Sequence, residues 1–196
     1  EKSTIALFKK MGLDCTELEN KGRRLILPIP GTPFEVVLAK AADVITYIEH
    51  GVCDVGVVGK DTIMEYGGSF FEIADLGIGR CRFALACKKG EDFYSGYAEK
   101  TIATKYPNVS RQFFEKKGMD VRIVKIEGSV ELAPLLGLSD AIVDIVETGT
   151  TLRENGLAVI EDVAQVTARV IVNTVSMKLS KVEIGKRIAD LERGLP

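Results

Sequence analysis

Two acidic side chains lie where an apolar run opens into a glycine-containing turn. The apolar run Ala141–Val146 carries Asp144, and Glu147 follows it directly. The turn that comes next consists of Thr148, Gly149, Thr150 and Thr151. Backbone N–H groups in such a turn can surround an anion, whereas the carboxylates would repel an anion and accept hydrogen bonds from sugar hydroxyls. These residues predict a ligand with a phosphate at one end and a diol at the other, such as phosphoribose.

A short helix is expected directly after this turn. Thr151 and Glu154 fit the capping-box pattern of a helix start, and Gly156 is typical of a helix end. The N-terminus of such a helix favours a phosphate. The turn is not a nucleotide P-loop, because the Gly-Lys-Ser/Thr ending is missing. The alternative is a capped strand-to-helix turn with solvated acids and no ligand.

A second glycine turn lies earlier in the chain, at Gly59, Lys60 and Asp61. Lys60 can meet a phosphate, and Asp61 can instead cap the helix that follows. The segments around both turns contain Gly-x-x-Asp, a buried strand and a glycine turn in the same order. This internal similarity predicts two related α/β lobes that bind ligands outside the carboxyl ends of their strands.

The composition of the chain argues against several classes of protein. Its 196 residues carry a net charge of −2, which disfavours broad binding to nucleic acid or anionic membranes. No apolar run is long enough for a membrane span and no signal-peptide pattern opens the sequence, so a cytoplasmic protein is expected. Four cysteines without a CxxC pair and a single histidine predict reduced thiols and no metal site.

Short apolar runs alternate with helical patterns, which predicts parallel α/β construction. The predicted strands are Arg24–Ile29, Glu35–Leu38, Val52–Val58, Arg80–Cys87, Thr101–Ala103, Asp120–Ile126, Ala141–Val146, Leu157–Val163 and Ala168–Met177. The predicted helices are Glu1–Gly12, Asp43–Glu49, Asp61–Tyr66, Pro107–Gly118, Val130–Leu136 and Lys181–Arg193.

The run Glu127–Leu157 resembles the signature of the ATP phosphoribosyltransferase family. The matching positions are Gly128-Ser129-Val130-Glu131, Ala133-Pro134, Gly137, Asp140, Asp144, Thr148-Gly149 and Thr151-Leu152. The segments Asp43–Asp61, Gly79–Ala86 and Ile102–Val109 are also similar to family segments. The resemblance covers essentially the whole chain, and it is to the short form, which lacks a C-terminal regulatory domain.

The resemblance implies an enzyme that joins ATP to phosphoribosyl pyrophosphate, with Mg²⁺ accompanying the substrates. It also implies two α/β lobes of the type-II periplasmic-binding-protein kind, which we place at residues 1–87 with 168–196 and at residues 88–167. The second lobe would carry the phosphoribosyl pyrophosphate loop. A regulatory subunit that resembles histidyl-tRNA synthetase is implied as the partner, with a homodimer of this chain inside a hetero-oligomer.

Roles for individual residues follow from the same resemblance. Thr148 to Thr151 would hold the 5′-phosphate, while Asp144 and Glu147 would face the ribose hydroxyls. Arg23 or Arg24 would steady the leaving pyrophosphate, with Arg24 taken as the catalytic one. The residues assigned to ATP are Gly59, Lys60, Asp61 and Arg82.

Two features depart from the family pattern. The family begins with a strand and a Lys-Gly-Arg motif, and that segment is absent before Glu1, so an incomplete pyrophosphate site is expected. Lys40 stands where many relatives have arginine, and lysine lacks the bidentate fork. The alternatives are a solute-binding module of the same fold and a nucleobase phosphoribosyltransferase, although the latter lacks the Glu-Gly-Ser-Val-Glu and Ala-Pro context.

Overall fold

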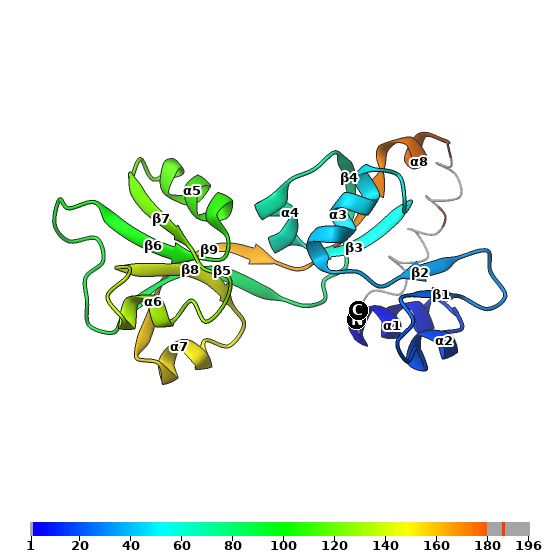
Figure 1. Cartoon of the computed structure of the whole chain (residues 1–196), viewed down its shortest axis with the longest axis horizontal. Coiled ribbons are helices and arrows are strands. Elements are labelled where there is room, and N and C mark those ends of the chain that lie inside the picture. Colours follow the sequence, from blue (N-terminus) through cyan, green and yellow to red (C-terminus); the bar gives the residue numbers. More distant parts are fainter. Residues whose placement is uncertain (1, 180–185, 187–196) are drawn as a thin grey trace. The chain divides into compact units, whose positions relative to one another are not determined.

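The chain divides into two units, because the strands of each unit pair only with one another. Each unit is described by itself. The structure is a computed structural model that describes residues 2–179 and 186 (Figure 1). Unit 1 comprises Glu1–Ile63, Gly67–Gly79 and Thr167–Pro196, and unit 2 comprises Met64–Tyr66 and Arg80–Val166. Apart from Lys186, the predicted closing helix Lys181–Arg193 lies outside the described residues.

Unit 1 is built on a three-stranded antiparallel sheet in the order β3-β10-β4. The three strands of this sheet are β3 (Val55–Gly59), β4 (Phe70–Asp75) and β10 (Ala168–Asn173). The unit also has a separate two-stranded antiparallel sheet of β1 (Ile26–Pro28) and β2 (Glu35–Val37). Its helices are α1 (Lys2–Lys10), α2 (Thr16–Glu19), α3 (Ala41–Glu49), α8 (Thr174–Leu179) and most of α4 (Lys60–Tyr66).

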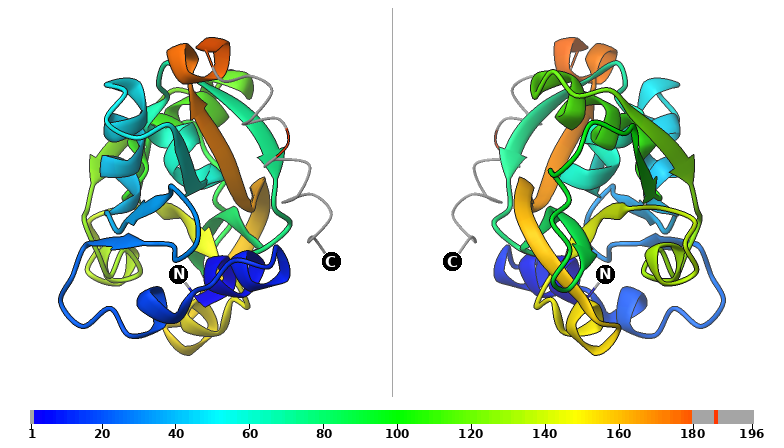
Figure 2. Two further views of the ribbon diagram at one scale, coloured as in Figure 1. Left: turned by 90° about the vertical axis from the view of Figure 1, so that its right-hand side faces the viewer. Right: turned by 90° about the vertical axis from the view of Figure 1, so that its left-hand side faces the viewer.

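A close helix-to-sheet contact holds the core of unit 1 together. Helix α3 lies against β3 and β10. Figure 2 shows α3 in cyan and β10 in orange. Gly56 permits this approach, because a Cβ there would lie 2.8 Å from Cγ1 of Val44. Ile45, Ile48, Val58 and Ile171 are buried in the cluster that results.

Unit 2 is built on a five-stranded sheet in the order β7-β6-β8-β5-β9. Its strands are β5 (Cys81–Lys88), β6 (Lys100–Thr104), β7 (Val121–Lys125), β8 (Ala141–Val146) and β9 (Leu157–Val166). Its helices are α5 (Pro107–Lys116), α6 (Leu132–Leu135) and α7 (Thr150–Glu154). Apolar side chains cover both faces of this sheet, with Phe114 of α5 in one cluster and Leu152 of α7 in the other.

The strands of unit 2 differ in direction, and this decides where ligands can bind. β6 runs parallel to β7 and β8, whereas β5 runs antiparallel to β8 and β9. The prediction of a parallel α/β construction was therefore correct only for β7-β6-β8. The carboxyl ends of these three strands lie at one edge of the sheet, which is where ligands bind in such arrangements.

The predicted boundary between the lobes was also wrong at one point. Residues 80–87 were expected in the first lobe, but β5 pairs with β8 and β9 and so belongs to unit 2. The four cysteines are free thiols, as predicted. Among the described residues, no helix combines the length and the apolar character needed to cross a membrane.

Candidate active site

Three loops meet at the carboxyl edge of the parallel strands in unit 2. Lys105 follows β6, residues 126–131 follow β7, and Glu147 with the Thr-Gly-Thr-Thr turn follows β8. The register pairs Thr104 with Val143 and with Lys125, so β6 and β7 end side by side and β8 continues beyond them to Val146. The backbone N–H of Ile126 donates to the carbonyl of Thr104 over 2.9 Å, which holds two of the loops together.

Asp144 is a half-buried carboxylate on the β8 face that also carries Ile142 and Val146. Burial raises its pKa, and the nearby Glu131 carboxylate raises the pKa further. The N–H of Ile145, which donates to Oδ1 over 2.8 Å, and the ammonium group of Lys105 act in the opposite direction. Glu147 is exposed at the end of the strand. The strand thus brings one shielded and one solvated acid to the same edge.

The turn after Glu147 begins a helix, but not in the way that the capping-box pattern predicted. The N-cap is Gly149, whose φ of 72° is left-handed, and α7 starts at Thr150. Thr151 therefore lies inside the first turn of the helix, and no side chain caps the N-terminus. Gly156, with φ of 71°, follows the helix as predicted. Glycine is favoured at position 149 because L-residues with a Cβ are strained at that φ.

The hydroxyls of Thr148 and Thr150 lie side by side, with their Oγ1 atoms 3.0 Å apart. The guanidinium group of Arg153 reaches both ends of this pair. Its Nη1 donates to the carbonyl oxygen of Thr148 over 3.0 Å, and its Nη2 donates to Oγ1 of Thr150 over 3.0 Å. The turn therefore combines a left-handed glycine with two hydroxyls and the guanidinium group of Arg153. Hydroxyl and guanidinium groups are hydrogen-bond donors suited to a phosphate.

Sequence reasoning missed Arg153, Lys105 and Glu131 as parts of this edge. Arg153 follows Thr150 by three residues, a spacing that puts two helical side chains on one face, so this signal was present in the sequence. Lys105 and Glu131 come to the site only through strand pairing, which the sequence does not reveal. Ser129 has φ of 49° and is the one non-glycine residue with positive φ in the described ranges. Such backbone strain is concentrated at functional sites.

Arg82, which was assigned to ATP, lies in unit 2 on the strand beside β8. Its register partner is Val146, so it shares a sheet face with Asp144. Its Nε donates to Oδ1 of Asp162 over 2.6 Å. The position is therefore next to the turn, although the side chain is engaged by an acid from β9.

Gly59, Lys60 and Asp61 lie together at the start of α4 in unit 1. Gly59 is the N-cap, and Lys60 forms an ion pair of 2.5 Å with Glu72. Asp61 lies in the first turn, and no side chain caps this helix, so the alternative role of Asp61 as its N-cap is wrong. A phosphate at Lys60 would have to compete with the Glu72 carboxylate.

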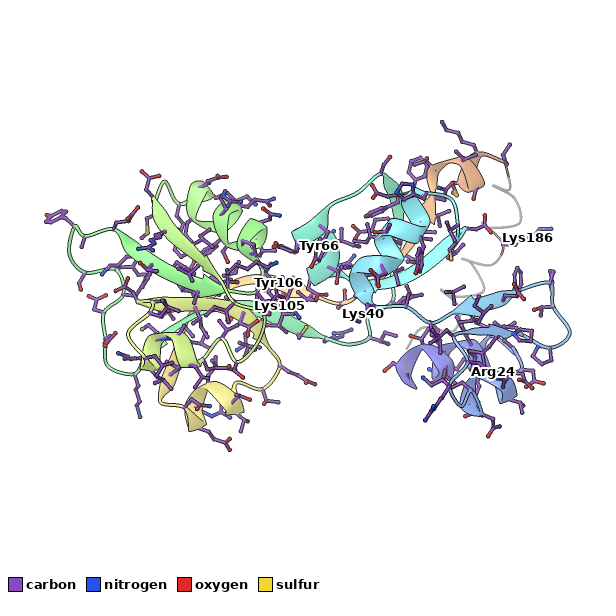
Figure 3. All side chains as sticks on the ribbon, viewed as in Figure 1. Arg24, Lys40, Tyr66, Lys105, Tyr106 and Lys186 are labelled. Carbon is purple, nitrogen blue, oxygen red and sulfur yellow. The ribbon has the colours of Figure 1, made fainter. Side chains whose placement is uncertain are left out.

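Arg23 and Arg24 lie in an exposed turn before β1 in unit 1. Arg24 is labelled in Figure 3. Its Nη1 is 2.7 Å from a carboxylate oxygen of Glu17, and its Nη2 donates to the carbonyl of Asn20 over 3.3 Å. The structure thus divides the predicted site residues between two units. Asp144, Glu147, the turn and Arg82 are in unit 2, and the others are in unit 1.

Comparison with known proteins was consistent with one family. A family model described as HisG: ATP phosphoribosyltransferase matches residues 40–193. A curated ATP phosphoribosyltransferase from Clostridium kluyveri is 57% identical over 188 residues, covering 96% of this chain and 86% of the relative. One from Clostridium botulinum is 54% identical over 193 residues, covering 97% of this chain and 91% of the relative.

Solved structures support the same family and the fold. The ATP phosphoribosyl transferase (HisG:HisZ) complex from Thermotoga maritima contains a chain with a TM-score of 0.81 and 34% identity, covering 99% of this chain and 92% of that chain. The periplasmic aliphatic sulphonate binding protein SsuA from Escherichia coli has a TM-score of 0.60 at 10% identity, covering 97% of this chain and 69% of that chain. This second likeness concerns the fold alone, a mixed α/β fold of the periplasmic-binding-protein kind.

Proposed function

Because the chain belongs to the ATP phosphoribosyltransferase family, and to its short form, we propose that unit 2 binds the phosphoribosyl group of phosphoribosyl pyrophosphate at the edge described above. The chain is a transferase that catalyses the first step of histidine biosynthesis. One observation carries the proposal: the turn with its two hydroxyls and Arg153 directly follows the strand that presents Asp144. Hydrogen-bond donors for a phosphate and hydrogen-bond acceptors for a diol therefore lie only a few residues apart in the chain.

In the proposed binding mode, Thr148, Gly149, Thr150 and Thr151 hold the 5′-phosphate, while Asp144 and Glu147 accept hydrogen bonds from the ribose hydroxyls. The N1 atom of adenine attacks the anomeric carbon, and the bond from that carbon to the pyrophosphate oxygen breaks. Positive charge develops on the ribose ring as pyrophosphate leaves. In this binding mode the two carboxylates would stabilise that charge. No covalent nucleophile is required, because positioning and charge account for the catalysis.

We further propose that residues of unit 1 handle the leaving group and ATP. Arg23 and Arg24 remain our assignment for pyrophosphate, with Arg24 as the catalytic one. Gly59, Lys60 and Asp61 of unit 1, with Arg82 of unit 2, remain our assignment for ATP. Lys60 would exchange its ion pair with Glu72 for a phosphate, which costs little at a partly exposed position.

Mg²⁺ is proposed to arrive bound to the substrates. Within residues 2–179 and 186, no three histidine, cysteine or acidic side chains gather into a metal site. Pyrophosphate and ATP supply the hard oxygen ligands that Mg²⁺ prefers, and such sites need only one or two protein carboxylates. The ion would neutralise charge on the departing pyrophosphate.

A regulatory partner is also proposed. The Thermotoga maritima relative was solved as a HisG:HisZ complex. We propose that this chain likewise assembles, as a homodimer inside a hetero-oligomer, with a regulatory subunit that resembles histidyl-tRNA synthetase. The proposed location is the cytoplasm, where both substrates are available.

The proposed phosphate loop is tested by changing its backbone and one hydroxyl. Gly149→Val combined with Thr151→Ala should lower the affinity for phosphoribosyl pyrophosphate by roughly a hundredfold, which is the loss of two or more charge-assisted hydrogen bonds. Valine at a φ of 72° would distort the turn, and its Cβ would lie 3.3 Å from Nη1 of Arg153. The measurement is titration calorimetry with phosphoribosyl pyrophosphate.

Gly118→Val is the matched control, because Gly118 has a similar φ of 65° at the end of α5 and a Cβ there would meet open space. It should strain the backbone equally and leave binding intact. Unchanged affinity in the loop variant would refute the loop assignment. The reaction itself is followed as the rise in ultraviolet absorbance when phosphoribosyl-ATP forms in the presence of the regulatory partner.

A further inference from the structure

The guanidinium group of Arg153 makes a two-point contact with the turn that it follows in sequence. Nη1 donates to the carbonyl oxygen of Thr148 and Nη2 donates to Oγ1 of Thr150, each over 3.0 Å. The contact spans Gly149, so that a Cβ at Gly149 would lie 3.3 Å from Nη1. The planar fork of arginine fits two acceptors at once, which a lysine ammonium group on a flexible chain does not reproduce.

The contact fixes which atoms of the turn can meet an anion. The Thr148 carbonyl oxygen carries partial negative charge and would repel a phosphate if it pointed at one. Bound to Arg153, that oxygen is both held and neutralised. The contact also brings a full positive charge to a turn that lies beside Glu147 and near Asp144. The repulsion expected between these acids and a phosphate is reduced accordingly.

The same contact orients the hydroxyl protons. A threonine hydroxyl has one proton to donate and two lone pairs that accept. Oγ1 of Thr150 accepts from Arg153, and it also shares a hydrogen bond of 3.0 Å with Oγ1 of Thr148. Only one proton is used between the two hydroxyls. Whichever hydroxyl donates it, the other retains a proton that can point at a phosphate oxygen.

We propose that Arg153 is a positioning residue for the 5′-phosphate, acting through the Thr148 carbonyl and the Thr150 hydroxyl. The inference rests on the proposed phosphate loop and adds a specific residue to it. Arg153 holds the turn in its anion-binding form and aligns one hydroxyl proton toward the ligand. Its contribution is therefore to the phosphate end of phosphoribosyl pyrophosphate and to neither pyrophosphate nor ATP.

The first test separates the two ends of the substrate. In Arg153→Gln the KM for phosphoribosyl pyrophosphate should rise roughly tenfold, the effect of losing hydrogen bonds from a charged donor. The KM for ATP should be unchanged. Inhibition by ribose 5-phosphate should weaken by the same factor, whereas inhibition by pyrophosphate should not change. Arg153→Lys should resemble Arg153→Gln, because the fork is lost although the charge remains.

Arg111→Gln is the matched control, since Arg111 also bonds a side chain three residues earlier, Asn108, over 2.9 Å, but on α5. It should leave all four constants unchanged. An unchanged KM for phosphoribosyl pyrophosphate in Arg153→Gln would overturn the inference. So would an Arg153→Lys enzyme with wild-type KM, because charge alone would then suffice.

The second test asks whether Arg153 acts through Thr150. Thr150→Val removes the hydroxyl that accepts from Nη2, and Thr150→Ser keeps it. Because one of the two routes passes through that hydroxyl, the double variant Arg153→Gln with Thr150→Val should lose less affinity than the sum of the two single losses. Additive losses would overturn the route. Retained binding in the Gly149→Val, Thr151→Ala variant would instead refute the loop, so the two failures are distinguishable.

Discussion

Asp144 in its ionised form is expected to lower the stability of the fold, and the ionised form is the one that its proposed role requires. The carboxylate is half-buried on an apolar sheet face, and burial raises its pKa above the reference value of 3.8. The folded state therefore disfavours the ionised form. An ionised carboxylate is nevertheless what ribose hydroxyls and a developing positive charge require. Such conflicts between stability and function are typical of active sites.

The conflict predicts how Asp144→Asn should behave. A carboxylate whose folded pKa is raised destabilises the fold at pH values above that pKa, and this destabilisation disappears as the pH falls below the unfolded pKa. Asp144→Asn should therefore be more stable than the wild type at pH 7, with the difference vanishing toward pH ~4. Turnover should fall by about a hundredfold, because the charge is lost. Urea denaturation at several pH values measures the first effect.

Asp120→Asn is the control, because Asp120 is exposed directly before β7. Its stability should follow the wild type at each pH. An Asp144→Asn variant that is less stable than the wild type at pH 7 would contradict the argument. A stability difference that does not change with pH would contradict it as well.

Single elements were predictable where the local pattern was complete. The bounds of β8 were predicted correctly from a continuous β-branched run. The segment Ala168–Met177 was predicted as one strand, but the strand ends at Asn173 and α8 begins at Thr174. The side chain of Asn173 explains the change, since its Oδ1 accepts the N–H groups of Val175 over 2.9 Å and of Ser176 over 3.0 Å. Because apolar residues continue past Asn173, the sequence pattern did not indicate that the strand ends there.

The direction of strand pairing was not predictable in the same way. A buried strand has the same apolar pattern whether its neighbours run parallel or antiparallel. The antiparallel partners of β8 and β10 are set by the path of the whole chain. For the same reason the sequence predicts that Asp144 and the turn lie together, but it does not predict that Lys105 and Glu131 lie beside them.

Asn173 also gives a prediction at the level of elements. Its Nδ2 donates to the carbonyl of Ile48 over 2.6 Å, which joins β10 to the end of α3. Asn173→Ala would remove this bond and the cap of α8 together, with an expected loss of roughly 2 kcal/mol in the free energy of unfolding. The measurement is urea denaturation at pH 7.

Asn20→Ala is the comparison for this variant. Asn20 also donates to a helix carbonyl, that of Thr16 over 3.0 Å, but its side chain is exposed. It should cost less than ~0.5 kcal/mol. Equal losses in the two variants would show that burial of Asn173 is unimportant, against the prediction.

At the scale of the whole molecule, each unit has its own buried clusters. Phe83, Ile102 and Val143 lie in a cluster of unit 2, and Ile48 and Ile171 lie in one of unit 1. The prediction of two lobes relied on an internal similarity and on the family resemblance. The boundary at residue 87 failed because β5 pairs entirely within unit 2.

This division predicts where a sugar phosphate protects the chain. The proposed phosphoribosyl site uses loops of unit 2, so ribose 5-phosphate alone should slow hydrogen exchange in peptides that cover 126–131 and 147–154. A ligand that binds only the folded form of a region suppresses the local opening of that region. Exchange in β3 and β10 of unit 1 should not change. The Gly149→Val, Thr151→Ala variant should lose the protection while Gly118→Val retains it. Protection confined to unit 1 would place the sugar phosphate elsewhere and refute the assignment of this site to unit 2.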